Sequence, residues 1–491
     1  MLRRLAHVSR DALVYGIAGA LSRVSGLILL PLFTNYFTAG EYGIYQSVTN
    51  LGALLLSITV LGLDGATAIL YFSRDDPAYR RTITTLWVLI TVAVAVPVTL
   101  GLFLAAEWLS WVATGTPEHA HLFRLGVAAL PFSVFLFTAN NILRYLFRAR
   151  TYAALNFGLT VAVAVAIVYL VAVAGMGLDG ALWGTLAGTA LLAIPGAWAI
   201  RDAVSPGQSL RSAEVWATAR RMLQLGLPLV PASIALWVTN FSNTYFLLQL
   251  VGERAAGVFR IGAQLAALLS LVIWAFQLAW VPYSLSIARE ADAPRTYSRM
   301  VVLFTAGTVG ASVLLSALAP AMLRLLTTRD YAEAASVIGL LSLAAAASGA
   351  YQMVALGANL AQRTGVVAWT ALSAAVTNVA LNVALIPLWG MVGAGLASLA
   401  ANLVSTSLVY MMSQRLYPIP YQAYRILSIW LAGGACVGAS GVFNVAVAPG
   451  VLLSLGVAVL LVLFFVGVMF GLGIVTVREM AVLWGALKRR M

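Results

Sequence analysis

The chain has very little charge and almost no cysteine. Of its 491 residues, 9% are charged and 62% are hydrophobic, a composition that a soluble domain cannot carry without aggregating. Cys436 is the single cysteine, which excludes an intrachain disulfide and a cysteine metal cluster. The sequence also has no nucleotide-binding loop and no connection long enough for a soluble catalytic domain. It therefore argues against an ATP-driven pump or a membrane synthase, and it predicts neither a cofactor nor a metal.

What the chain does contain is a series of fourteen apolar runs. Each is near the length needed to cross ~30 Å of hydrocarbon. Lipid leaves only helices and closed barrels as spanning structures, and runs this long are not barrel strands. The sequence therefore predicts an all-α, polytopic membrane protein with fourteen transmembrane helices. The runs lie at 11–36, 43–72, 83–106, 119–147, 152–174, 178–200, 220–250, 254–285, 300–326, 334–360, 365–387, 392–413, 425–446 and 450–474.

The basic residues are distributed unevenly along the chain, whose net charge is +13. With both termini and the even-numbered connections in the cytoplasm, 23 of the 29 Lys and Arg lie on that side. This asymmetry follows the positive-inside rule and predicts a multi-pass protein of the plasma (inner) membrane with cytoplasmic termini. The basicity then needs no nucleic acid as a partner. The exceptions are Arg254, Arg324 and Arg329, expected outside, and Arg23, Arg124 and Arg260, expected within spans.

The chain matches itself at two nearly equal offsets. Residues 177–187 align with 390–400, and residues 43–55 align with 257–269, which pairs span 6 with span 12 and span 2 with span 8. Two matches at nearly the same offset indicate duplication into two pseudo-symmetric six-helix lobes that run in the same direction, as in parallel-repeat transporters. The expected parts are an N-lobe at 1–200, a cytoplasmic linker at 201–219, a C-lobe at 220–413, and spans 13 and 14 with an amphipathic cytoplasmic tail at 414–491.

Amide side chains are concentrated in the spans that begin each lobe. In hydrocarbon each such group needs a hydrogen-bond partner. Bonds between neighbouring helices are one explanation, worth ~0.6 kcal/mol per contact. The alternative is a hydrated cavity whose amides contact the hydroxyls of a glycan. The candidate glycan-binding residues are Gln46, Asn50, Asn141, Asn240, Asn243 and Gln264.

Three arginines within spans are candidates for binding an anion. Arg23 lies near the middle of span 1, and Arg260 and Arg124 lie about two turns below the expected outer ends of spans 8 and 4. A guanidinium at membrane depth costs several kcal/mol unless it faces water or a partner. Arginines converging on one cavity would suit a phosphate or diphosphate, because their donors match its oxygens. Arg124 could instead reach the outer interface, and Arg23 could pair with Asp64.

Asp64 is the one carboxylate well inside an expected span. An acid at that depth could take up a proton or sodium ion and couple transport to a gradient. It could equally neutralise Arg23, and the sequence leaves both roles open.

The opening of the chain resembles that of a known family. Residues 22–26 (SRVSG), 30–34 (LPLFT) and 40–45 (GEYGIY) are similar to the start of polysaccharide biosynthesis flippases in the multidrug/oligosaccharidyl-lipid/polysaccharide exporter superfamily. The span count and the doubled lobes agree with this resemblance over essentially the whole chain. The resemblance implies translocation of an isoprenoid-diphosphate-linked oligosaccharide from the inner to the outer leaflet by alternating access. Implied partners are this substrate, membrane lipids, and the glycosyltransferases or polymerase of the same pathway.

The same superfamily supplies two of the three competing interpretations. Its lipid II flippases carry functional arginines in spans 1, 2 and 8; Arg23 and Arg260 can stand for two of these, but span 2 has no arginine here. Spans 13 and 14 border a lipid-tail groove in those proteins, a role the resemblance extends to this chain. A cation-coupled exporter of drugs or metabolites is another alternative, although related multidrug exporters usually have twelve spans. A non-transporting scaffold of a glycan assembly complex is the third.

Overall fold

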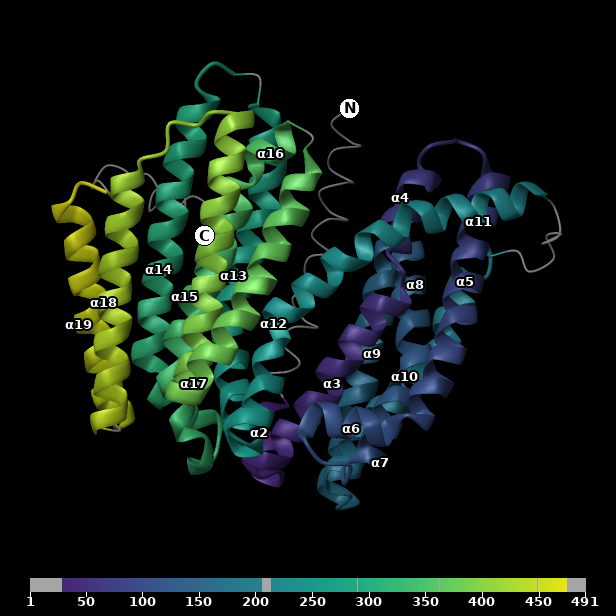
Figure 1. Ribbon diagram of the computed structural model, residues 1–491, viewed down its shortest axis with the longest axis horizontal. Coiled ribbons are helices and arrows are strands. Elements are labelled where there is room, and N and C mark those ends of the chain that lie inside the picture. Colours follow the sequence, from purple (N-terminus) through teal and green to yellow (C-terminus); the bar gives the residue numbers. More distant parts are fainter. Residues whose placement is uncertain (1–28, 205–212, 289, 362, 448, 475–491) are drawn as a thin grey trace. The chain divides into compact units, whose positions relative to one another are not determined.

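The computed structural model describes residues 29–204, 213–288, 290–361, 363–447 and 449–474. Every regular element within these ranges is a helix (Figure 1). The predicted all-α class is therefore confirmed. By packing, the chain divides into a first unit, Met1–Gly257, and a second unit, Val258–Met491.

The first unit contains most of the short helices. At one end lie α4 and α11, and at the other lie α6 and α7 (Figure 1). Its α-helices are α2 (Leu30–Tyr36), α3 (Ala39–Thr59), α4 (Leu63–Tyr71), α5 (Pro77–Leu104), α6 (Ala106–Thr114), α7 (Ala120–Ala128), α8 (Leu130–Tyr145), α9 (Ala149–Val168), α10 (Gly177–Ile200), α11 (Ala213–Gly226) and α12 (Val230–Leu250); η1 (Tyr169–Val173) is a π-helix and η2 (Leu227–Leu229) a 3-10 helix.

The second unit is built mainly from long helices. Helix α13 begins in the first unit and continues into the second. The elements are α13 (Glu253–Ser286), α14 (Ala293–Leu326), the 3-10 helix η3 (Arg329–Ala334), α15 (Ala335–Val354), α16 (Leu356–Leu360), α17 (Thr364–Leu416), α18 (Ala423–Val447) and α19 (Val451–Gly471).

Twelve helical stretches among the described residues are long and apolar enough to cross a membrane. One of them, Gly365–Leu416, contains both expected spans 11 and 12, which are separated by a non-helical backbone at Gly390. Most of expected span 1, including Arg23, and the tail at 475–491 lie outside the described residues. The chain is thus a multi-pass membrane protein of the expected helical architecture.

Helix starts follow from local sequence. Thr38 caps α3: its hydroxyl accepts from the Glu41 backbone N–H at 3.3 Å, and Glu41 accepts from the Thr38 backbone N–H at 2.8 Å. This reciprocal capping box satisfies two backbone donors at the start of the helix. Asp76 caps α5 by accepting from the Ala78 N–H, and Pro77 occupies the first turn, where its missing donor costs nothing.

Several expected spans are broken in the structure, among them span 4 between α7 and α8 and span 10 between α15 and α16. Span 2 is interrupted between α3 and α4, with Leu61 and Gly62 at φ +54° and +65°, and span 7 tightens into η2 after Gly226. The breaks in spans 2 and 7 meet within the first unit: a Cβ on Gly226 would lie 2.5 Å from the Leu61 carbonyl oxygen, and one on Gly62 would overlap the Gly226 carbonyl. Two glycines are needed there because the backbones touch directly.

The two repeat matches have a structural basis. Gly177 and Gly390, which align at an offset of 213, both have positive φ, +57° and +52°. Three residues later, Gly180 and Gly393 each lie against the backbone of the preceding helix, at Leu170 and Leu385. The turns between spans 5 and 6 and between spans 11 and 12 therefore share a glycine with positive φ and a close backbone approach three residues later.

The second match places aligned residues in reciprocal contact. A Cβ on Gly43 would lie 2.5 Å from the Glu253 carbonyl oxygen and 3.0 Å from the Gly257 nitrogen. A Cβ on Gly257 would overlap the Ala39 carbonyl oxygen and lie 3.0 Å from the Gly43 nitrogen. Ala39 and Glu253 are themselves aligned at this offset of 214, so the segments 39–43 and 253–257 are related by a local two-fold axis.

The packing boundary and the expected lobe boundary fall at different places. Packing divides the chain after Gly257, so that α11 and α12 belong to the first unit. Helix α11 begins at Ala213, inside the expected linker of 201–219. The division into lobes at that linker describes the repeat and stays a prediction.

The core of the second unit forms around α14. Val309 and Phe304 of α14 belong to one cluster with Cys436 and Val437 of α18 and Phe465 of α19, all buried. Glycines allow these helices to approach closely: a Cβ on Gly433 would overlap the Val309 side chain, and one on Gly310 would lie 3.1 Å from the Phe465 ring. Helices α18 and α19 thus pack on α14 as part of the same unit.

Candidate functional site

Helices α3 and α12 share a polar interface in the first unit, which we call the α3–α12 seam and define by Ser47, Asn50, Trp237 and Tyr245. The Trp237 indole Nε1 donates to the Asn50 carbonyl oxygen at 2.8 Å. The Tyr245 hydroxyl donates to the Ser47 carbonyl oxygen at 2.7 Å, and the two aromatic rings lie 5.5 Å apart. Aromatic side chains of span 7 thus donate to backbone carbonyls of span 2 and hold the two spans together.

Two polar atoms of the seam have no hydrogen-bond partner in the described part of the chain. They are the Ser47 Oγ and the Asn50 Nδ2, and both residues are buried, at 0% and 3% exposure. A buried polar group without a partner is costly, so such groups are expected to meet water or ligand. The seam therefore supplies a hydroxyl and an amide donor suited to a hydroxylated ligand.

The other predicted amides of these two helices differ in exposure. Gln46 and Asn243 are buried on α3 and α12, at 9% and 3%. Asn240 is exposed, and its amide donates to the Leu236 carbonyl one turn earlier in the same helix. The structure thus places Gln46, Asn50 and Asn243 on two helices that pack together, with Asn240 on an outer face.

Asn141 and Asp64 lie on neighbouring helices, α8 and α4. The Tyr145 hydroxyl donates to the Asp64 carbonyl oxygen at 2.8 Å, and Arg144 donates to the Asn141 Oδ1 at 3.3 Å. Asp64 is half-buried in the first turn of α4, directly after the break in span 2, and its side chain forms no ion pair with the residues described. A carboxylate at a helix N-terminus is stabilised by the helix dipole.

Arg260 and Gln264 belong to the second unit. Both are half-buried on α13, one turn apart and hence on one face of the helix. Their spacing lets a guanidinium and an amide address the same ligand. Arg23, the third member of the predicted anion site with Arg124, lies outside the described residues.

Arg124 has a carboxylate partner. Its Nη2 lies 3.4 Å from the Glu107 Oε1, with the two side chains 40% and 73% exposed. Both predicted roles of Arg124, at the outer interface and in a diphosphate site, stay predictions. The sequence did not identify Glu107, which lies on α6, a short helix between two expected spans.

Two histidines at the same end of the first unit also take separate partners. The His119 Nε2 lies 3.2 Å from the Glu253 Oε1, and the His121 Nε2 lies 3.5 Å from the Asp179 Oδ1. The first contact joins α7 to the start of α13, next to the backbone contact between Gly43 and Gly257. His119 and Glu253 are 134 residues apart in sequence, so no local motif could have paired them.

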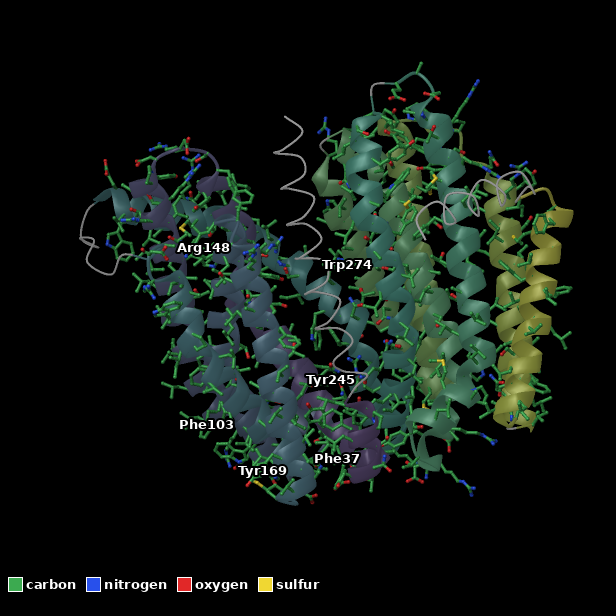
Figure 2. The ribbon with its side chains drawn as sticks, turned by 180° about the vertical axis from the view of Figure 1, so that it is seen from behind. Phe37, Phe103, Arg148, Tyr169, Tyr245 and Trp274 are labelled. Atoms are coloured by element: carbon green, nitrogen blue, oxygen red, sulfur yellow. The ribbon has the colours of Figure 1, made fainter. Side chains whose placement is uncertain are left out.

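An ion pair lies at the opposite end of this unit, where Figure 2 places Arg148 far from Phe37 and Tyr169. Arg148 forms a two-pronged bond with Asp202, in which Nη1 lies 3.0 Å from Oδ1, and its Nη1 also donates to the Ala199 carbonyl. Hydrogen bonding from Arg148 holds the pKa of Asp202 below its usual value. The pair joins the start of α9 to the end of α10.

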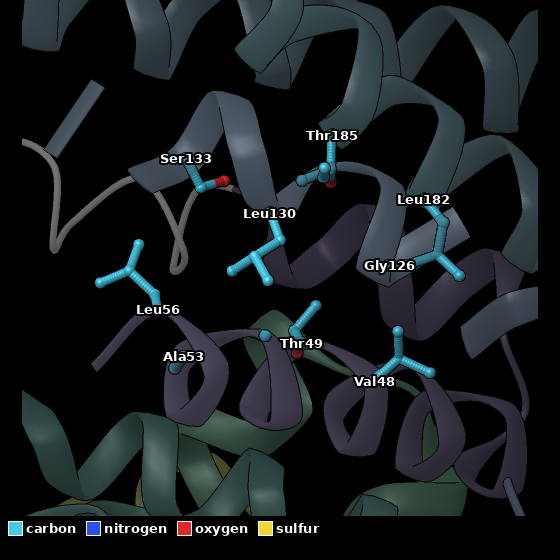
Figure 3. Close-up of a pocket in the computed structure, with 11 residues that line it drawn as sticks. Val48, Thr49, Ala53, Leu56, Gly126, Leu130, Ser133, Leu182 and Thr185 are labelled. Atoms are coloured by element: carbon cyan, nitrogen blue, oxygen red, sulfur yellow. The ribbon is translucent and has the colours of Figure 1, made fainter. Parts of the chain in front are cut away.

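A small cavity of about 190 Å³ lies beside α3, between expected spans 2, 4 and 6 (Figure 3). Most of its lining is apolar, and Thr49, Ser133 and Thr185 are its hydroxyl-bearing residues. Thr49 and Thr185 bond to backbone carbonyls of their own helices. With those hydroxyls bonded and no charged side chain in its lining, the cavity does not resemble a site for a charged head group.

Comparisons with known proteins agree on family and fold. A family model described as "Polysaccharide biosynthesis protein" matches residues 8–288. A structure of the lipid II flippase MurJ in an inward closed conformation is 13% identical, covers 93% of this chain and 99% of its own, and has a TM-score of 0.73. An inward-facing multidrug resistance MATE family transporter of the MOP superfamily is 15% identical, covers 84% of this chain and 98% of its own, and has a TM-score of 0.60.

A mutant of the Vibrio cholerae MATE transporter VcmN gives a similar result, with 15% identity, a TM-score of 0.58, and coverage of 84% of this chain and 96% of its own. No curated protein sequence matches the chain. At these identities the structural comparisons establish a shared fold.

Proposed function

The chain belongs to the polysaccharide biosynthesis protein family, and we propose that it is a flippase that moves an isoprenoid-diphosphate-linked oligosaccharide from the cytoplasmic to the outer leaflet. The observation that carries this proposal is the family match over 8–288 in a chain with a transporter fold. Such a protein would act by alternating access rather than by catalysing a covalent reaction. Its product would feed cell-surface polysaccharide assembly, with glycosyltransferases or a polymerase as partners.

Moving a charged, sugar-bearing head group across a membrane requires a polar path through otherwise apolar helices. A diphosphate carrying sugars cannot cross hydrocarbon unaided, because both parts must lose water without compensation. An isoprenoid tail can remain in lipid while the head group moves. The positive-inside distribution supports a plasma-membrane protein whose termini and Arg148–Asp202 end face the cytoplasm. On that orientation, the His119–Glu253 end faces outward.

We assign binding of the head group to the arginines and amides that stand out in the sequence. Arg23 and Arg260 bind the diphosphate, because guanidinium groups stay charged at any relevant pH and match phosphate oxygens. Amides of α3 and α12, with Asn141 and Gln264, bind the glycan. The buried Asn50 amide and Ser47 hydroxyl support this assignment, because they are donors without a protein partner in the described chain. Asp64 couples a proton or sodium ion.

The test is flipping of a fluorescent polyprenyl-diphosphate oligosaccharide in proteoliposomes. We expect Arg260→Ala to lower the flipping rate at least tenfold, since a charge-assisted hydrogen bond is worth about 1.5–3 kcal/mol. Arg254→Ala is the matched control, because Arg254 is an exposed arginine six residues earlier on the same helix. Arg23→Ala is measured in parallel, and each variant is checked for folding by its melting temperature.

Unchanged flipping in both Arg23→Ala and Arg260→Ala would remove these arginines from the mechanism. Absence of flipping by folded wild type with several glycans would shift support to the alternatives. Efflux of a cationic dye would then indicate a drug or metabolite exporter, and flipping of lipid II would indicate the peptidoglycan precursor as substrate. If the protein moves nothing yet co-purifies with glycosyltransferases, a scaffold becomes the better description.

A further inference from the structure

The second unit contains a polar cavity that the proposed transport site does not use. It has a volume of about 440 Å³ and lies where α14 ends and η3 and α15 begin, with α18 forming one wall. Two arginines, two threonines and an asparagine provide its polar lining: Arg324, Thr327, Thr328, Arg329 and Asn444.

The two arginines of this cavity depart from the charge distribution of the chain. Arg324 lies at the end of span 9 and Arg329 in the connection that follows, a place that the positive-inside rule puts outside, where basic residues weigh against the correct orientation. Both residues are exposed. The nearby carboxylates of η3, Asp330 and Glu333, are not part of the cavity lining. Charge at this place therefore needs an explanation other than membrane topology.

Helix electrostatics explains only one of the two. Arg324 lies in the last turn of α14, where a cation offsets the partial negative charge of the terminal carbonyls. Arg329 instead begins η3, and the described residues contain no carboxylate within ion-pair distance of it. A second guanidinium beside the same cavity is what an anionic ligand would require.

The walls of the cavity are fixed independently of any ligand. Asn444 on α18 donates from Nδ2 to the Ser316 carbonyl of α14 at 2.9 Å, which holds the two helices together. The Thr327 hydroxyl donates to the Leu323 carbonyl at 2.7 Å, so this side chain is also fixed. The Thr328 Oγ1 is buried and has no partner among the residues that the structure describes. A site whose walls are already ordered loses less entropy on binding.

We infer that this cavity binds the phosphate group of a lipid head group on the outer side of the membrane. Two guanidinium groups and a hydroxyl match a phosphate ester in charge and in donor number. The cavity lies at the turn between two membrane-spanning helices, the depth at which lipid head groups are found. A soluble phosphate shares this chemistry, and the test separates the two sources. The inference does not depend on which molecule is transported.

The test measures binding of three probes to the full-length protein in a phosphate-free detergent: farnesyl diphosphate, dihexanoyl phosphatidylglycerol and inorganic diphosphate. Arg329→Gln should weaken binding of the preferred probe about tenfold, as expected for loss of one charge-assisted hydrogen bond. Arg329→Lys should lose part of the affinity, because it keeps the charge but not the fork of donors. Arg254→Gln, another arginine expected outside, should bind as wild type does because it does not line the cavity.

Tighter binding of the two lipids than of inorganic diphosphate would support a head-group site. Tighter binding of inorganic diphosphate would overturn the lipid assignment. The inference also fails if wild type binds none of the probes, if Arg329→Gln binds as tightly as wild type, or if Arg254→Gln loses as much affinity. Because farnesyl diphosphate also fits the proposed transport site, Arg260→Ala is measured with the same probes; a loss of affinity in Arg329→Gln that is absent in Arg260→Ala assigns the binding to this cavity.

Discussion

Helices α5 and α14 occupy the same place in the repeat, as the third span of each lobe, yet they differ in burial. Of the most apolar 18-residue stretch, 22% is buried in α5 and 61% in α14. The difference comes from α18 and α19, which lie outside the repeat and cover α14 in the second unit. At the Gly177 and Gly390 turns, where no added helix intervenes, both halves keep a glycine with positive φ. The duplicated halves therefore share their turns and differ in what covers them.

The largest effect is expected from adding a side chain at the contact between Gly43 and Gly257, where aligned segments of the two halves meet. Gly257→Ala puts a Cβ into the Ala39 backbone and Gly43→Ala puts one into the Glu253 backbone, so each should destabilise the protein by more than about 3 kcal/mol. Thermal unfolding in detergent measures the loss. Gly52→Ala is the control, because nothing lies within 4 Å of its Cβ and alanine is the better helix former. A large loss at one glycine alone would contradict the reciprocal contact.

The greater burial of α14 can be tested by substituting residues of α19, one of the helices that cover it. Phe465 is 3% exposed within the α14 cluster, whereas its neighbour Phe464 is 60% exposed. We expect Phe465→Ala to cost on the order of 3 kcal/mol through lost packing, and Phe464→Ala to cost well under 1 kcal/mol. Equal melting temperatures for the two variants would mean that α19 does not support the second unit.

Substituting the glycines of the two equivalent turns should give a smaller loss of stability, and in the same direction in both halves. Gly177→Ala and Gly390→Ala each force a side chain into positive φ, at a cost of about 1–2 kcal/mol. Gly390 should be the more sensitive, since its ψ of −128° lies outside the left-handed helical region. Gly365→Ala, in the first turn of α17 with open space around it, serves as the reference in the same unfolding assay. Unequal signs for the two turns would show that they are not equivalent.

The smallest effect concerns an ion pair of the first unit. Asp202→Asn removes the partner of Arg148, and at neutral pH we expect a loss below about 0.5 kcal/mol because both side chains are partly exposed. The pKa of Asp202 is lowered in the folded protein, so its contribution is present above the unfolded pKa of about 3.9 and disappears as pH falls through the folded pKa. Melting curves of variant and wild type should converge in acid; a gap that widens there would contradict the assignment.

The sequence predicts the spans but not the interruption of span 2. Long apolar runs are unambiguous because hydrocarbon admits no irregular backbone exposed to it. The break after Thr59 was missed because Val60, Leu61 and Gly62 are apolar and continue the run. Its cause lies 164 residues away, at Gly226, whose backbone meets Gly62.

The sequence identifies polar residues of the candidate site but not the residues that they contact. Amides such as Asn50 and Asn243 stand out in the sequence because polar groups are costly in lipid. Trp237 and Tyr245 do not, since aromatic residues are common in spans and their acceptors here are backbone carbonyls. Arg324 and Arg329 were visible as exceptions to the charge rule, but the shared cavity appears only once α18 is folded against α14.

The reciprocal contact of Gly43 and Gly257 bears on how such a chain could arise. A homodimer of single six-helix lobes would bring this glycine against its own copy on the dimer axis, with the carbonyl four residues earlier facing it from either side. Fusing two gene copies preserves that arrangement only while both positions remain glycine. Both positions should therefore remain glycine across descendants while the sequences of the two halves diverge around them.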